Sequence, residues 1–251
     1  MGNSAITIQE FALGESVLHK MDPRAKIIAA IVFAVVVAVN RSVVASAVAL
    51  VFPLTLIFIS HISLKDIARR LVFINGLMVF LWLFLPFTTP GEPVYSLGSL
   101  TVTREGLVYG LLLTLKSNAI VLAMIALLGT SPVFNLVHAL SHMGVPDKLV
   151  HMFFFCFRYI HVIADEYHTL VDAAKVRGFK PGTNMHSYRT YGHFVGMLLV
   201  KSFDRARRIM DAMKCRGFSG RFYVLHHYEM RTNDYLLPAI SAVFALMLLV
   251  I

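Results

Sequence analysis

Charge and cysteine are scarce in this sequence. Of its 251 residues only 15% are charged, whereas 57% are hydrophobic, and the mean hydropathy is +0.71. Soluble globular domains carry about 25% charged and about 45–50% apolar residues, so the composition excludes an ordinary soluble domain. Several apolar runs approach the roughly 20 residues that a helix needs to cross a bilayer, which indicates a polytopic membrane protein. The two cysteines, Cys156 and Cys215, form no Cys-x-x-Cys pair, and we expect reduced thiols.

The sequence also lacks the common catalytic motifs. It contains no Gly-x-x-x-x-Gly-Lys-Ser/Thr loop for nucleotide phosphates, no His-Glu-x-x-His zinc helix and no Gly-x-Ser-x-Gly nucleophile turn. His138 and His142 have the i,i+4 spacing of two metal ligands on one helix face, but structural zinc sites use four ligands and no third is obvious nearby. We therefore expect no catalytic residue and no metal site. A membrane-bound enzyme that uses this histidine pair is an alternative.

The apolar segments predict an all-α fold with about five transmembrane helices, at residues 27–39, 43–60, 71–87, 106–130 and 236–251. Asp22 is a good N-cap and Pro23 suits the first helical position, so the first helix begins there, with Arg24 where the chain enters lipid. Residues 88–105 are rich in Gly, Pro, Ser and Thr and predict a loop with a short hairpin. Lys116 lies inside the fourth segment, where a lysine is either functional or paired within the bundle.

A charged region follows the fourth apolar segment. Residues 131–231 contain 14 Lys or Arg and 7 Asp or Glu. Helices are predicted at 133–143, 147–178 and 188–217, and the two long ones carry amphipathic stretches. On the last helix Lys201, Arg205 and Arg208 share one face, which predicts a partner interface. The pattern divides the chain into membrane helices at 1–130, amphipathic helices at 131–231 and a final transmembrane helix at 232–251.

The two long amphipathic helices end in the same motif. Residues 171–179 read Val-Asp-Ala-Ala-Lys-Val-Arg-Gly-Phe, and residues 210–218 read Met-Asp-Ala-Met-Lys-Cys-Arg-Gly-Phe, which match at six of nine positions. Glycine just past the last turn is a common helix stop, and arginine in that turn is favoured by the negative end of the helix dipole. The motif therefore predicts an arginine held at a helix tip, twice, and such tips suit grooves lined with carboxylates.

The distribution of basic residues predicts the orientation in the membrane. Of the 23 Lys and Arg residues, 20 lie before the first segment, between the second and third, or in the region 131–231. Only Arg41 and Arg104 lie in the loops on the opposite side. Cytoplasmic loops of membrane proteins carry the excess of Lys and Arg, so the amino terminus and residues 131–231 are predicted to be cytoplasmic.

These features resemble the transmembrane T component of energy-coupling factor (ECF) transporters. In that family two helices end in Ala-Arg-Gly-type motifs that insert into two ATPase subunits. The matching triplets here are Val176-Arg177-Gly178 and Cys215-Arg216-Gly217, with Val176 and Cys215 in place of the small residue. The Asp-Pro-Arg sequence at residues 22–24 is similar to that family's entry to the first crossing, and Asp22 and Arg24 are further candidates for a partner interface. The stretch 213–223 is similar to the cobalt/nickel branch, the CbiQ-like proteins.

The resemblance implies a non-catalytic subunit of an ATP-driven importer in a bacterial or archaeal cytoplasmic membrane. Two cytoplasmic ABC ATPase subunits would hold ATP and Mg²⁺ and push on Arg177 and Arg216. The helix pair would pass this motion to a separate, metal-specific S component that binds cobalt or nickel. The chain itself would hold no cofactor and bind no nucleic acid. A self-sufficient ion channel or secondary carrier that uses Lys116 is the alternative from another class.

Overall fold

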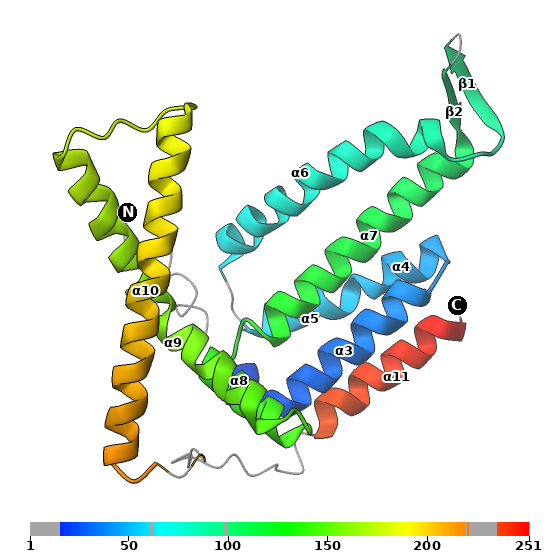
Figure 1. Ribbon diagram of the computed structural model, residues 1–251. Helices are drawn as coiled ribbons and strands as arrows, with labels where there is room; N and C mark the ends of the chain where they lie inside the picture. Colours follow the sequence, from blue (N-terminus) through cyan, green and yellow to red (C-terminus); the bar gives the residue numbers. More distant parts are fainter. Residues whose placement is uncertain (1–15, 61–62, 98–99, 219, 221–234, 251) are drawn as a thin grey trace. The chain divides into compact units, whose positions relative to one another are not determined.

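The computed structural model describes residues 16–60, 63–97, 100–218, 220 and 235–250, most of which lie in helices (Figure 1). The chain divides into two compact units, residues 1–144 with 228–251, and residues 145–227. The described elements of the first unit are α2 (Val17–Lys20), α3 (Pro23–Val39), α4 (Val43–Ala49), α5 (Val51–Ser60), α6 (Leu64–Thr88), β1 (Pro93–Leu97), β2 (Leu100–Thr103), α7 (Arg104–Leu127), α8 (Val133–His142) and α11 (Leu236–Val250). Those of the second are α9 (Asp147–Val176) and α10 (Met185–Cys215).

The prediction of an α-helical polytopic membrane fold is confirmed. Within the described residues, three spans are long and apolar enough to cross a bilayer, at Val43–Ser60, Lys65–Thr88 and Arg104–Leu127. α3, with 17 residues, and the apolar part of α11, Leu236–Leu248, are shorter. The division of the chain at residues 130 and 231 remains a prediction, and residue 231 lies outside the described residues.

Two local features refine the predicted helices. The segment predicted at 43–60 consists of α4 and α5, which meet at Leu50. Pro53 lies just beyond this break, and since proline has no N–H, the carbonyl of Ala49 cannot receive the usual helical hydrogen bond. The hairpin predicted within residues 88–105 is also present, because β1 and β2 pair antiparallel with Ser96 opposite Thr101.

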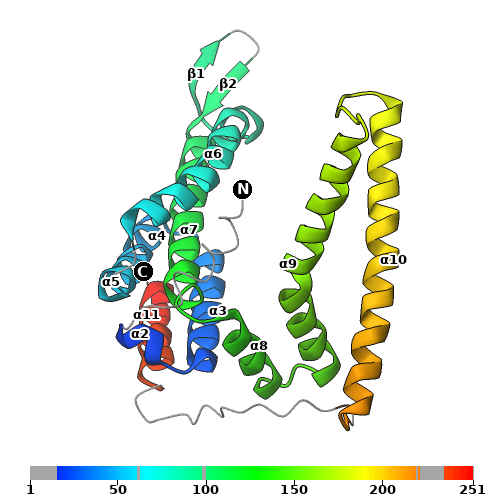
Figure 2. The same cartoon turned by 90° about the vertical axis from the view of Figure 1, so that its left-hand side faces the viewer.

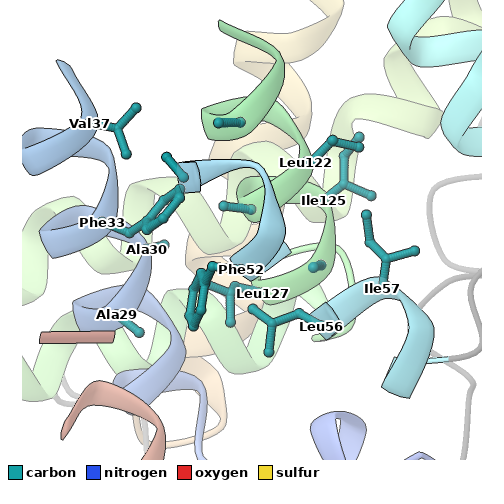
Figure 3. Close-up of a cluster of buried hydrophobic side chains, with 14 of the residues drawn as sticks. Ala29, Ala30, Phe33, Val37, Phe52, Leu56, Ile57, Leu122, Ile125 and Leu127 are labelled. Carbon is teal, nitrogen blue, oxygen red and sulfur yellow. The ribbon is translucent and has the colours of Figure 1, made fainter. Parts of the chain in front are cut away.

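The core of the first unit lies between α3, α4, α5, α7 and α11 (Figure 3). The rings of Phe33 and Phe52 lie 5.1 Å apart and those of Phe52 and Phe244 5.4 Å apart, so aromatic contacts join three helices. Alanines are almost fully buried along the facing surfaces, at Ala29, Ala30, Ala45, Ala49, Ala119, Ala123 and Ala126. Helices in lipid gain little from the hydrophobic effect, and small side chains let their backbones approach closely enough for dispersion contacts.

A buried lysine links the start of α3 to the turn between α7 and α8. Lys26, in the first turn of α3, is 0% exposed. Its Nζ donates to the Ser131 Oγ at 2.6 Å and to the Thr130 Oγ1 at 3.3 Å, in the turn between α7 and α8. Asp22 caps the same end of α3, because its Oδ1 accepts from the Arg24 backbone N–H at 2.8 Å. The start of α3 is therefore fixed to the chain segment that follows the last turn of α7.

The second unit consists of two long helices that cross (Figure 1). α10 begins three residues before the predicted start because the Asn184 side chain accepts from the Ser187 N–H at 2.8 Å and caps it. Glu166 on α9 accepts from the Arg205 guanidinium of α10 at 2.9 Å and lies 3.2 Å from the Lys201 ammonium. Partial desolvation acts to raise the pKa of Glu166, but the hydrogen bonds and charges of Lys201 and Arg205 outweigh it and lower the pKa.

We expect Lys26→Met to destabilise the first unit, because the Ser131 hydroxyl loses its buried donor. An unsatisfied buried polar group costs about 1–3 kcal/mol. In a chain of this size that lowers the melting temperature by several degrees. The measurement is thermal unfolding of the purified chain in detergent, with Lys148→Met, at an exposed position, as the matched control. Equal melting temperatures for the two variants would contradict the assignment.

We expect Glu166→Gln to loosen the crossing of α9 and α10 at pH 7, seen as faster amide hydrogen exchange in both helices. Because the pKa of Glu166 is lowered on folding, its ion pairs contribute fully above the ordinary glutamate pKa of about 4.3 and are lost as the pH falls through the lowered pKa. The neighbouring exposed Asp165→Asn is the control and should exchange like the unaltered chain. Equal effects of the two substitutions would show that the ion pairs do not hold the crossing.

Candidate functional site

The two matching motifs form the same structure at two helix ends. Arg177 is the C-cap of α9 and Arg216 the C-cap of α10. Gly178 and Gly217 follow in the left-handed region, with φ of +85° and +81°. In the first copy the Gly178 N–H donates to the Lys175 carbonyl at 2.9 Å and the Phe179 N–H to the Ala174 carbonyl at 3.0 Å.

The second copy has the same pair of hydrogen bonds. The Gly217 N–H donates to the Lys214 carbonyl and the Phe218 N–H to the Met213 carbonyl, both at 3.0 Å. These are the two bonds of a Schellman motif, which satisfies carbonyls that the end of a helix leaves open. Within the described part of the chain, a Cβ at either glycine would meet no atom within 4 Å, so the glycines are required by backbone conformation and not by space. The predicted helix tips are thus present in both copies.

Both tips are open to a partner. Val176, before the first arginine, is 90% exposed, and Cys215, before the second, is also exposed. The side chains of Arg177 and Arg216 are exposed, and neither forms an ion pair within the part of the chain that the structure describes. Two guanidinium groups with unused donors at rigid positions are suited to carboxylates or backbone carbonyls of another protein.

The tips lie at opposite ends of α10 (Figures 1 and 2). Arg177 ends α9 just before the short connection to the start of α10, and Arg216 follows the last residue of α10. α10 has 31 residues. At 1.5 Å per residue it spans about 46 Å, so the two arginines are spaced for two binding sites rather than for one pocket.

An aromatic cluster, formed by Phe179, Tyr191 and Phe194, fixes the first tip to α10. The Phe179 ring lies edge-on to Tyr191 at 5.9 Å and to Phe194 at 6.1 Å, and Tyr191 and Phe194 lie edge-on at 5.8 Å. Phe194 is only 9% exposed. Edge-to-face aromatic pairs contribute about 0.5–1.5 kcal/mol beyond their burial. Since Phe179 is two residues after Arg177, the cluster restrains the direction of that arginine relative to α10.

A groove of about 240 Å³ lies between α9 and α10. Its lining is mainly aromatic and aliphatic: Phe155, Tyr159, Ile163, Ser202, Arg205, Ala206, Ile209, Met210 and Met213. Methionine side chains adapt to partners of different shape. The Arg205 Nε is buried and donates to no acceptor among the described residues. The groove therefore offers a mainly apolar surface.

The other predicted interface residues differ in their contacts and in their exposure. Lys201 and Arg205 contact Glu166, a residue that the sequence analysis did not identify. Arg208 is exposed. Asp22 and Arg24 contact each other in the first turn of α3, where Asp22 is 2% exposed. Glu166 is one of six acidic residues in α9 and α10, and its partners lie 35 and 39 residues away in the sequence, so no local signal singled it out.

Lys116 and the histidine pair have local contacts. The Lys116 Nζ donates to the Ala38 carbonyl at 2.8 Å, at the end of α3, so its ammonium takes part in helix packing. The Nε2 atoms of His138 and His142 lie 3.3 Å apart on α8. Among the described residues no group of three His, Cys, Asp or Glu side chains is placed to hold a metal ion.

The chain is similar to known membrane transport proteins. The EcfT transmembrane protein of the energy-coupling factor transporter of Bacillus selenitireducens is 28% identical over 228 residues, covering 86% of this chain and 85% of that protein. The EcfT proteins of Thermosediminibacter oceani and Listeria innocua are each 29% identical, covering 86% and 82% of this chain and 85% and 82% of their own. The model of the CbiQ family, described as cobalt transport protein, matches residues 14–227. The chain therefore belongs to the CbiQ cobalt transport protein family.

Proposed function

We propose that this chain is the transmembrane coupling subunit, or T component, of an ECF-type ABC importer. The observation that carries the proposal is the pair of exposed arginines on identical Schellman caps at opposite ends of α10. Membership of the CbiQ family and similarity to proteins named EcfT support it. The chain is non-catalytic in this proposal, and ATP and Mg²⁺ are held by two cytoplasmic ABC ATPase subunits.

In the proposed mechanism each arginine tip docks in one ATPase subunit. The guanidinium of Arg177 pairs with acceptors on one subunit and that of Arg216 with acceptors on the other. Closure of the ATPases on ATP moves the two contact points. One tip lies at each end of α10, and the helix moves as one body. Glu166, which pairs with Lys201 and Arg205, passes this motion to α9.

The groove between α9 and α10 is the proposed docking surface for the substrate-binding S component. Its apolar lining suits a transmembrane helix. Arg208 lies exposed on the same helix. The family description favours cobalt, with nickel as the close chemical relative, and this ion is bound by the S component and not by this chain. The chain lies in a bacterial or archaeal cytoplasmic membrane, with its amino terminus in the cytoplasm.

Replacing both arginines, Arg177→Ala with Arg216→Ala, tests the proposal. In the purified complex we expect ATP hydrolysis to lose its transport-coupled stimulation, by at least about tenfold, because hydrogen bonds to charged groups contribute roughly 1.5–3 kcal/mol each. Membrane insertion should be unchanged, because both side chains are exposed. The control is Arg189→Ala, an exposed arginine on α10 outside the motifs. Full coupling in the double variant, or an equal loss in the control, would contradict the proposal.

Phe179→Ala should weaken coupling by acting through Arg177. We expect stimulated ATP hydrolysis to fall several-fold while the complex still co-purifies, because the aromatic cluster no longer restrains the tip. In a double-mutant cycle with Arg177→Ala the second substitution should add almost nothing, since a displaced arginine and a missing one are equivalent. Phe179→Tyr should restore function, and Tyr188→Ala, at an exposed aromatic of α10, is the control. Additive losses would show that Phe179 acts independently of Arg177.

A further inference from the structure

The exposed face of α6 combines cationic and apolar side chains in one continuous stripe. Lys65 and Arg69 lie four residues apart at its start, and the face continues at steps of three and four through Val72, Phe73, Gly76, Val79, Phe80 and Leu83. The five large apolar side chains in this set are 59–84% exposed. We call this set the α6 stripe. It faces away from the rest of the unit, because the opposite face of α6 carries the buried Ile67 and packs on α7.

The two cations of the α6 stripe are available to a ligand. The side chains of Lys65 and Arg69 are exposed, and neither makes an ion pair or hydrogen bond with the residues that the structure describes. Asp66, the acidic residue of the first turn, forms no ion pair with either. Cations near the ends of transmembrane helices extend toward the headgroup region, where anionic lipids contribute about 1 kcal/mol per Lys or Arg.

Gly76 forms a notch in the middle of the stripe. A Cβ built there would meet no atom of the described residues within 4 Å, so none of these residues occupies this space. Val72, Phe73, Val79 and Phe80 surround the glycine along the helix face, and all four are more than half exposed. Between large side chains, a glycine leaves a shallow depression in which a flexible hydrocarbon chain can contact the backbone.

The dimensions of the α6 stripe match one lipid molecule. From Arg69 to Phe80 the helix rises about 16 Å at 1.5 Å per residue. Half of a hydrocarbon core about 30 Å thick is about 15 Å, which is the length of the acyl chains in one leaflet. When Gly76 and the apolar side chains of the stripe lie beside the lipid acyl chains, the two cations thus lie at the level of the lipid headgroups. We propose that the α6 stripe is a binding site for an anionic phospholipid of the leaflet at the start of α6.

In this site the lipid phosphate accepts hydrogen bonds from Lys65 and Arg69, and one acyl chain lies over Gly76. The bound lipid completes a helix that has few protein neighbours, since α6 contacts mainly α7 and the hairpin. It also anchors the start of α6 at a fixed depth in the membrane. This assignment is independent of the proposed coupling role, because none of its residues belongs to the arginine tips or to the groove.

The test is native mass spectrometry of the full chain, titrated with phosphatidylglycerol or with phosphatidylcholine of the same acyl chains. We expect phosphatidylglycerol to bind more tightly than phosphatidylcholine. The double substitution Lys65→Ala with Arg69→Ala should reduce this ratio of affinities roughly ten- to thirtyfold. Arg69→Ala alone should lose part of it. Arg70→Ala, which removes the same charge from a neighbouring position outside the stripe, is the matched control and should bind like the unaltered chain.

Gly76→Leu tests the acyl part of the site with all charges kept, and we expect it to weaken phosphatidylglycerol binding several-fold. Glycerol phosphate, the headgroup without acyl chains, should not compete. Equal losses for Arg69→Ala and Arg70→Ala would overturn the site in favour of general attraction to basic residues, and unchanged binding by Gly76→Leu would also overturn it. So would cross-linking of Gly76→Cys to a partner subunit in the assembled complex, because a protein helix would then cover the stripe.

Discussion

The geometry of a helix end is the constraint on which the rest of this structure depends. A helix that stops at Arg-Gly leaves its last carbonyls without helical partners, and the left-handed glycine turns the chain so that two of them accept backbone N–H groups. The arginine before the glycine is then held at the tip with little backbone freedom. Because the end of α9 and the end of α10 both have this cap, one helix pair presents two fixed cations.

Other contacts hold the helices of each unit together. The aromatic cluster ties the first tip to α10, and Glu166 ties α9 to the middle of α10 with two cations. In the other unit, closely packed alanines and a buried lysine hold helices together where the hydrophobic effect contributes little. The buried contact of Lys26 with Ser131 lies where an unsatisfied polar group has a high desolvation cost.

Local sequence signals predicted a large part of this structure. The cap at Asp22, the hairpin before α7 and the helix stops at Gly178 and Gly217 depend on neighbouring residues, and the structure confirms them. The split between α4 and α5 has its signal in Pro53, which interrupts the apolar run at residues 43–60. The contacts of Lys26 with Ser131 and of Glu166 with Arg205 join residues 105 and 39 positions apart. Patterns of neighbouring residues do not identify such pairs, because only the packed fold brings them together.

Site-directed cross-linking at the two tips tests the central claim most directly. Cys215 is a natural exposed thiol beside Arg216, and Val176→Cys places a second thiol beside Arg177, in a Cys156→Ser background that removes the other cysteine. The experiment uses the complex formed with the ATPase subunits and a short bifunctional reagent. The account predicts that each thiol captures an ATPase subunit, that the two together capture two copies, and that capture changes on addition of ATP. Efficient assembly with capture at neither thiol would contradict it.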